Sequence, residues 1–229
     1  MSEIRVKGFH EVSFWREDSI GLIVLKADSH GMINLKTLEE LLTPLTTAVT
    51  DPEVSTIVIT GQNNHFCNGV NLKEAETEPF LNSCVAISNL IHSIEKPVLS
   101  VLNGTAKDFG YELALITDII ISGNENKVGY HNDYLPVLGS SISGHQFQDL
   151  TISSVRESRN VDLIFPRENL LGDVHDFIIS ASLTTLSYRR NLRLSDLGRA
   201  IDFEHLKVLK HFRMTETSSK EVKINNRGE

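Results

Sequence analysis

Side chains that could act as nucleophiles, metal ligands or phosphate cradles occur in this chain, but not in the patterns that those chemistries need. His65 and Cys67 lie two residues apart, and no second His or Cys cluster at zinc-binding spacing accompanies them. The run Gly139–Ser143 departs at its last position from the glycine-x-serine-x-glycine pattern of hydrolase nucleophiles. The sequence contains no glycine-rich phosphate loop. We therefore expect neither a metal site nor a nucleotide cradle.

The stronger chemical candidates lie in two polar stretches that follow buried, β-rich runs. The first is HFCNGVNLKE at residues 65–74, and the second, at residues 96–119, includes NGTA and GYELA. Glu112 lies in the second stretch, early in a short predicted helix. Taken alone, a carboxylate there is explained more simply by stabilisation of a helix N-terminus than by acid–base chemistry.

Together, the order and spacing of the two stretches resemble the crotonase superfamily, that is, the enoyl-CoA hydratase/isomerase family. The family shows a strand, then FxAGxDLKE, and then KPVIAAVNG-A-GGG-x-ELALxCDI. Here the matching runs begin at Phe66 and Lys96, and Met32-Ile33-Asn34 resembles an earlier helix start. The resemblance covers about residues 10–145, and more weakly residues 163–212. It implies an α/β crotonase (ClpP-like) fold, in which repeated ββα units form a spiral core with C-terminal helices.

The resemblance also assigns catalytic roles. It implies that the backbone N–H groups of Asn68 and Phe109 stabilise the charge that develops on a thioester oxygen when an enolate forms. It implies that Glu112 is the general acid/base. The family's second glutamate falls on Asn132, which cannot exchange a proton near neutral pH. Asp133 could replace it after a shift of one residue.

Other substitutions around the implied site alter its chemistry. The glycine-rich turn is Lys107–Gly110, which keeps only its last glycine, and Asp108 brings a carboxylate close to the implied oxyanion. His131, Tyr130 and Tyr134 are further protic candidates, although packing in a loop explains each of them more simply.

Coenzyme A, as part of the substrate, is the only cofactor that the resemblance implies. The residues that would contact it include Asn71, which replaces a family aspartate, and Lys73, which could meet a phosphate. The full set is Lys26, Ala27, Cys67, Asn71 and Lys73.

Two classes of function stay open at this point. The first is an acyl-CoA lyase or isomerase, with enoyl-CoA hydration as the family default. Isomerisation, decarboxylation or C–C hydrolysis would need only one carboxylate. The second is a catalytically degenerate acyl-thioester binding or assembly subunit. A third version keeps the enzyme but delivers the acyl group on a carrier protein's phosphopantetheine arm.

Hydrophobic patterning predicts the elements that must position these residues. Alternation and β-rich runs predict strands at residues 11–17, 20–25, 55–60, 98–102 and 118–122. Helical spacing predicts a first helix with Asn34 as its N-cap. It predicts further helices at residues 82–94 and 110–116, from Pro166 onward, and near residues 195–212. Pro44 is expected to kink or end the first helix early. Residues 130–162 follow no regular pattern.

The alternation of strands and helices predicts an α/β core with parallel pairing. We expect this core to span residues 1–162, a C-terminal helical region to span 163–214, and a polar tail to span 215–229. Relative to the family pattern, the chain is short near residues 142–160.

Composition limits partners and compartment. The net charge is −8, which disfavours nucleic acid as a partner. The two cysteines suit a reducing, cytoplasmic compartment, and no apolar run is long enough to span a membrane. The resemblance implies a homotrimer or hexamer, and an apolar stripe at residues 197–212 could serve its contacts.

Overall fold

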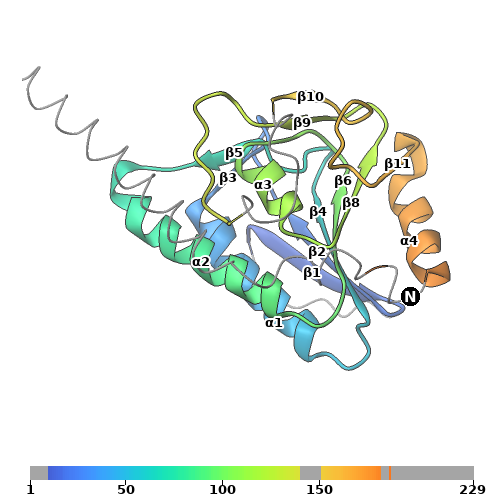
Figure 1. Cartoon of the computed structure of the whole chain (residues 1–229). Helices are drawn as coiled ribbons and strands as arrows, with labels where there is room; N and C mark the ends of the chain where they lie inside the picture. The colour runs from blue at the N-terminus through green and yellow to red at the C-terminus, as the bar shows by residue number, and fades with distance from the viewer. Residues whose placement is uncertain (1–9, 140–150, 182–185, 187–229) are drawn as a thin grey trace, which may run out of the picture.

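A six-stranded sheet forms the centre of the molecule (Figure 1). The computed structural model describes residues 10–139, 151–181 and Leu186. The strands of the sheet are β1 (Val12–Glu17), β2 (Ile20–Leu25), β4 (Thr56–Gly61), β6 (Val98–Leu102), β8 (Ile119–Gly123) and β11 (Leu163–Phe165). β1 and β2 form an antiparallel hairpin, and each later strand pairs in parallel with the one before it. The predicted parallel α/β core is therefore confirmed.

Short strands follow the main strands and form a second layer. β3 (Met32–Asn34) pairs with β5 (Gly69–Asn71), and β9 (Lys127–Gly129) pairs with both β7 (Ala106–Lys107) and β10 (Ser153–Ser154). Because β3, β5, β7 and β9 each come directly after a parallel strand, they gather at the carboxyl end of the main sheet. None of these short strands was predicted.

Three helices complete ββα units with these strands. α1 (Leu35–Thr50) follows β3, α2 (Thr77–Ser93) follows β5 and a 3-10 turn at Glu74–Glu76, and α3 (Phe109–Leu115) follows β7. The repeated ββα units expected from the sequence are present.

The first helix confirms one expectation and corrects another. Asn34 is its N-cap: the Asn34 side chain accepts a hydrogen bond from the Thr37 N–H at 3.0 Å. Pro44 neither ends the helix nor shortens it, because the helix continues to Thr50. The buried residues Leu41, Leu45 and Ala48, before and after Pro44, hold both halves of the helix against the core. Their burial outweighs a backbone penalty of roughly 3 kcal/mol for an interior proline.

The sheet separates two hydrophobic cores. The larger lies between the sheet and α1, α2 and α3, and includes Leu38, Ile59, Phe66, Ile87 and Leu113. The smaller lies on the opposite face, where α4 (Leu170–Ser180) packs after a 3-10 turn at Arg167–Asn169. β11 belongs to the main sheet, so the core extends past the predicted boundary at residue 162. The helix expected near 195–212 lies outside the described residues.

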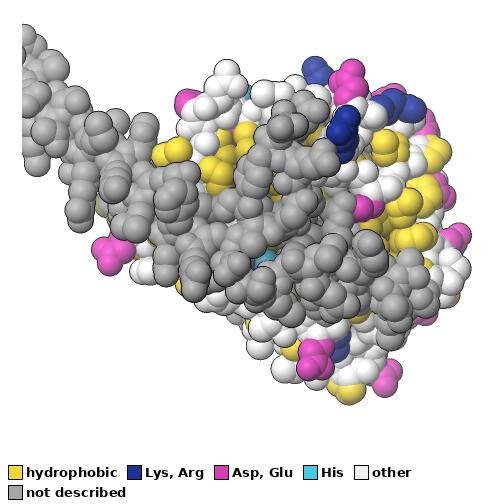
Figure 2. Space-filling view, in the orientation of Figure 1, with side chains coloured by type: hydrophobic (Ala, Val, Ile, Leu, Met, Phe, Trp, Pro, Cys, Tyr) yellow, Lys and Arg dark blue, Asp and Glu magenta, His cyan; other side chains and the backbone are white. Residues whose placement is uncertain are grey.

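The end of the molecule formed by β11 and α4 carries hydrophobic side chains on its surface (Figure 2). Ile164, Leu171 and Ile179 are the exposed large hydrophobic residues in the described part of the chain. None of the described helices is long and apolar enough to cross a membrane.

Candidate active site

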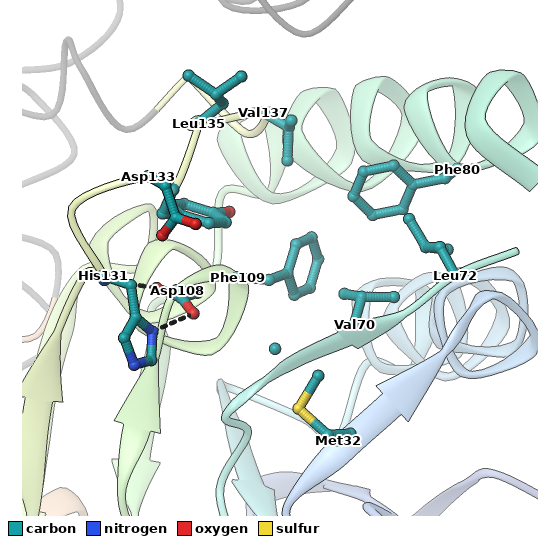
Figure 3. Close-up of a pocket in the computed structure, with 12 residues that line it drawn as sticks. Met32, Val70, Leu72, Phe80, Asp108, Phe109, His131, Asp133, Leu135 and Val137 are labelled. Carbon is teal, nitrogen blue, oxygen red and sulfur yellow. Dashed lines mark hydrogen bonds and ion pairs between the residues drawn. The ribbon is translucent and has the colours of Figure 1, made fainter. Parts of the chain in front are cut away.

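A cavity of about 550 Å³ lies among α2, β5, the start of α3 and the segment 131–137 (Figure 3). Most of its wall is apolar, and the apolar side chains are Met32, Val70, Leu72, Phe80, Phe109, Leu135 and Val137. The polar part of the wall lies on one side and consists of Asp108, His131, Asp133 and Tyr134. Among the residues that the structure describes, no lysine or arginine lines the cavity. The cavity therefore suits an uncharged, apolar group that reaches acid–base side chains at one side.

The two polar stretches singled out in the sequence meet beside this cavity. The Lys107 N–H donates to the Cys67 carbonyl at 2.9 Å, and Cys67 forms an isolated β-bridge with Ala106. Gly110 packs so closely there that a Cβ atom would lie 2.0 Å from the Cys67 oxygen. These backbone contacts hold the segments that carry Asn68 and Phe109 next to each other.

Glu112 is held differently from the expected arrangement. Its side chain is fully buried, and it is not among the residues that line the cavity. One carboxylate oxygen accepts hydrogen bonds from the Leu138 N–H at 2.7 Å and the Val137 N–H at 3.0 Å. The other accepts from the same Val137 N–H at 2.9 Å and from the Tyr134 hydroxyl at 2.6 Å. In this conformation Glu112 anchors the segment 134–138.

Tyr134 lies between this carboxylate and the cavity. It lines the cavity and donates its hydroxyl hydrogen to Glu112. Burial, followed by the charge of Glu112, raises the pKa of Tyr134 well above its usual range. Tyr134 therefore stays a neutral phenol, and it screens Glu112 from a molecule in the cavity.

Phe109 and Asn68, the two predicted oxyanion donors, differ in availability. The Phe109 N–H begins α3, so it has no acceptor within the helix, and none is found elsewhere among the described residues. The Asn68 N–H instead donates to the Gly31 carbonyl at 2.7 Å. The Asn68 side chain also donates to the His30 carbonyl at 2.9 Å. Asn68 therefore ties down the loop before β3.

Asn132 and Asp133 are both exposed, and only Asp133 lines the cavity. The residue beside them, His131, also lines it and forms a hydrogen-bonded pair with Asp108. His131 Nδ1 lies 2.7 Å from Asp108 Oδ2, and the His131 N–H donates to Asp108 Oδ1 at 2.8 Å. The sequence named His131 only as one of several protic candidates. It did not predict this pair.

The residues proposed to contact coenzyme A are dispersed around the cavity and outside its wall. Asn71 and Lys73 are both exposed, and strand alternation turns Asn71 away from the face that carries Val70 and Leu72. Lys26 donates through Nζ to the His10 carbonyl at 2.8 Å, and Ala27 packs on the main core. Cys67 is fully buried, and this burial raises the pKa of its thiol to about 12. The Cys67 side chain is thus a core residue and does not line the cavity.

Among the described residues, no group of three or more His, Cys, Asp or Glu side chains is arranged to hold a metal ion.

Comparisons with known proteins agree with this architecture. Solved enoyl-CoA hydratases share the fold: the Bacillus halodurans structure superimposes with a TM-score of 0.75 at 16% identity, covering 90% of this chain and 97% of that one. The enoyl-CoA hydratase from Mycobacterium avium subsp. paratuberculosis gives a TM-score of 0.73 at 16% identity, with coverages of 87% and 92%. The predicted crotonase fold is confirmed.

Sequence relatives are also named as hydratases. A probable mitochondrial enoyl-CoA hydratase of Dictyostelium discoideum is 30% identical over 124 residues, which cover 52% of this chain and 43% of that protein. The rat mitochondrial methylglutaconyl-CoA hydratase is 29% identical over 147 residues, with coverages of 60% and 47%. The matched region thus spans about half the length of these curated relatives. The profile described as enoyl-CoA hydratase/isomerase matches residues 16–135, more than half of the chain. The chain therefore belongs to the enoyl-CoA hydratase/isomerase family.

Proposed function

We propose that the protein acts on an acyl thioester of coenzyme A, with the acyl group in the cavity, and that it catalyses a lyase or isomerase reaction through a thioester enolate. The observation that carries this proposal is the apolar cavity, which is bounded by Phe109 at the start of α3 and has acid–base groups on one side. An acyl chain gains free energy from leaving water for such a wall.

The Phe109 N–H is the donor proposed to bind the thioester oxygen as charge develops on it. The second donor of the family's pair, the Asn68 N–H, becomes available only when the Gly31 carbonyl withdraws. Coenzyme A enters as part of the substrate, and Lys26 and Lys73 are the cations proposed to meet its phosphates. A trimeric or hexameric assembly is part of the same proposal, and light scattering after gel filtration measures it.

Neutral acyl groups are the proposed substrates. Within the described ranges, the ionisable residues of the wall are Asp108, Asp133, His131 and Tyr134, and no lysine or arginine there could pair with a second carboxylate. The free carboxylate of a dicarboxylic acyl group in this cavity would be repelled by the carboxylates of Asp108 and Asp133. Selectivity for a straight-chain acyl-CoA over the matching dicarboxylic acyl-CoA is expected to exceed about tenfold in kcat/KM, a difference of about 1.4 kcal/mol.

Binding and turnover are tested together. Calorimetry with hexanoyl-CoA measures affinity, and turnover is followed with crotonyl-CoA and 3-hexenoyl-CoA. Val70→Phe fills the cavity without changing an acid–base group, and it is expected to weaken acyl-CoA binding at least about tenfold. Leu171→Phe, on the exposed surface of α4, is the control. If wild-type protein does not bind hexanoyl-CoA, the proposal is wrong.

A second candidate function is an acyl-thioester binding subunit without turnover. Two pairings favour it: the Glu112 carboxylate is engaged by residues 134–138, and the Asn68 N–H is engaged by Gly31. Tight binding of acyl-CoA with no conversion of either enoyl substrate would select this function. Conversion of an acyl group on a carrier protein, without conversion of the CoA ester, would instead identify a carrier-delivered substrate.

A further inference from the structure

Asp108 and His131 are brought together by the second layer of strands. β7 and β9 pair in parallel, with Lys107 opposite Gly129, so the residues that follow them leave at the same edge. The Asp108 N–H then donates to the Gly129 carbonyl at 3.0 Å. This register places two residues that are 23 positions apart in the sequence within hydrogen-bond distance at the cavity wall.

The protonation pattern of the pair follows from its geometry. An ionised carboxylate can only accept hydrogen bonds, so Nδ1 of His131 is the nitrogen that carries hydrogen. In the neutral imidazole, Nε2 therefore keeps its lone pair. Nε2 has no hydrogen-bond partner among the described residues, and 53% of the His131 side-chain surface is exposed. The ring is thus oriented by one nitrogen while the other is accessible.

The backbone at Asp108 is in an unfavourable conformation. Its φ and ψ angles are 48° and −121°, and positive φ is uncommon for a residue other than glycine. A glycine would adopt this conformation without steric strain. Asp108 therefore occupies a position whose backbone conformation favours glycine. Such a conflict is typical of functional sites.

We infer that His131 is the proton-transfer residue of the proposed reaction and that Asp108 is its positioning residue. This inference rests on the proposed function and adds the group that handles the proton. Two other carboxylates at the site are less suited. Glu112 is screened by Tyr134 and anchored to residues 134–138. Asp133 is exposed, and no orienting partner for it is found among the described residues.

The proposed step balances without a further reactant. The Nε2 lone pair of His131 takes a proton from the carbon next to the thioester carbonyl. The electron pair of that C–H bond moves into the enolate, and the negative charge on its oxygen faces the Phe109 N–H. Asp108 stabilises the imidazolium. Return of the same proton to the α carbon restores the substrate, and its return to the γ carbon of a 3-enoyl thioester completes isomerisation.

His131→Asn is the main test, because the asparagine amide can still donate to Asp108 in place of Nδ1 but supplies no base. We measure isomerisation of 3-hexenoyl-CoA, incorporation of solvent deuterium at the α carbon of hexanoyl-CoA by NMR, and the Kd of hexanoyl-CoA. The expected result is a fall in both rates of about 100-fold or more with Kd unchanged within about threefold. His131→Gln serves as a second variant.

His175→Gln is the matched control, because His175 forms a similar pair with Asp18, at 3.0 Å, between α4 and the β1–β2 turn. Its rates should equal those of the wild type. For Asp108, both Asp108→Asn and Asp108→Gly are expected to lower kcat at least about tenfold without changing Kd. Asp108→Gly should do so without lowering the melting temperature, because glycine accepts the backbone conformation. A merely structural Asp108 would instead lower the melting temperature and leave kcat per folded molecule unchanged.

The outcomes separate this inference from the proposed function. If His131→Asn keeps the wild-type rates, while Asp133→Asn or Tyr134→Phe abolishes them, the inference is wrong and the proposed function stands. If wild-type protein binds hexanoyl-CoA but neither isomerises the enoyl substrate nor incorporates deuterium, both the enzymatic function and the inference are overturned.

Discussion

Replacement of Glu112 by glutamine is expected to destabilise the fold before it affects chemistry. The carboxylate accepts hydrogen bonds from three donors, Tyr134, Val137 and Leu138, at 2.6 to 3.0 Å. In the Glu112→Gln variant, the side-chain amide oxygen can keep the two backbone donors, and the NH2 group can donate to the tyrosine oxygen. All three hydrogen bonds then lose their ionic character.

The magnitude follows from these three bonds. A hydrogen bond to a charged group is worth about 1.5–3 kcal/mol and a neutral one about 0.5–1.5 kcal/mol, so roughly 1 kcal/mol is lost for each. The loss of about 3 kcal/mol is offset in part, because a buried amide has a smaller desolvation penalty than a buried carboxylate. We expect the free energy of unfolding to fall by about 2 kcal/mol.

Urea denaturation followed by circular dichroism measures this change. Tyr134→Phe removes one charge-assisted bond and should lower the unfolding free energy by about 1.5 kcal/mol. Glu39→Gln, on the surface of α1, is the control and should change it by less than about 0.5 kcal/mol. Stability of Glu112→Gln within about 0.5 kcal/mol of wild type would refute the anchoring role. Turnover of this variant must be normalised to its folded fraction.

Three further predictions concern single residues outside the acid–base groups. Because burial raises the pKa of Cys67 to about 12, iodoacetamide at about pH 8 should modify Cys67 only after denaturation. Peptide mass spectrometry detects the modification. Modification of the native protein at the rate of a free thiol would contradict the described burial. Hydrogen bonding to Asp18 raises the pKa of His175 above 6.5, so the stabilisation is complete below pH 6.5 and is lost as pH rises through the raised value. Asp18→Asn should therefore lower the melting temperature at about pH 5.5 and hardly change it at about pH 9. The effect on the unfolding free energy should be well below 1 kcal/mol, because the pair is exposed. An equal effect at the two pH values would be inconsistent with the ion pair. Gly110→Ala places a Cβ atom 2.0 Å from the Cys67 oxygen and should lower the unfolding free energy by about 3 kcal/mol in the same denaturation assay. A Gly110→Ala variant as stable as wild type would exclude the close contact between α3 and the segment before β5.

Five of the main strands could be predicted, because each is an alternating or continuous β-rich run long enough to show its pattern, whereas β11, with three residues, was not predicted. β4, for example, is buried at all six positions. The short strands β5 and β7 have three and two residues, too few to reveal a period of two. α2 begins at Thr77 and not at residue 82, because its first turn is polar and contains Pro79, which reads as loop in the sequence although proline is tolerated in a first turn.

At the site, the local motifs could be recognised in the sequence, whereas the pairings between residues far apart in the chain could not be predicted. The stretches that contain Asn68 and Phe109 could be recognised because each follows a main strand, and backbone contacts of Cys67 with Ala106 and Lys107 join these stretches. The burial of Glu112 depends on residues 134–138, which belong to the region without a regular pattern. The pairing of Asp108 with His131 depends on the β7–β9 register, which no local property of either residue reveals.

The strand order of the main sheet has a consequence for how the chain folds during synthesis. Because β1, β2, β4, β6, β8 and β11 are neighbours in chain order, each strand after β1 emerges from the ribosome when its earlier neighbour in the sheet has already been made. The β1–β2 hairpin can form first and give the next strand a ready edge. Every later strand of this sheet therefore meets a partner that is already made, so the nascent sheet can grow in one direction, from the β1–β2 hairpin toward β11.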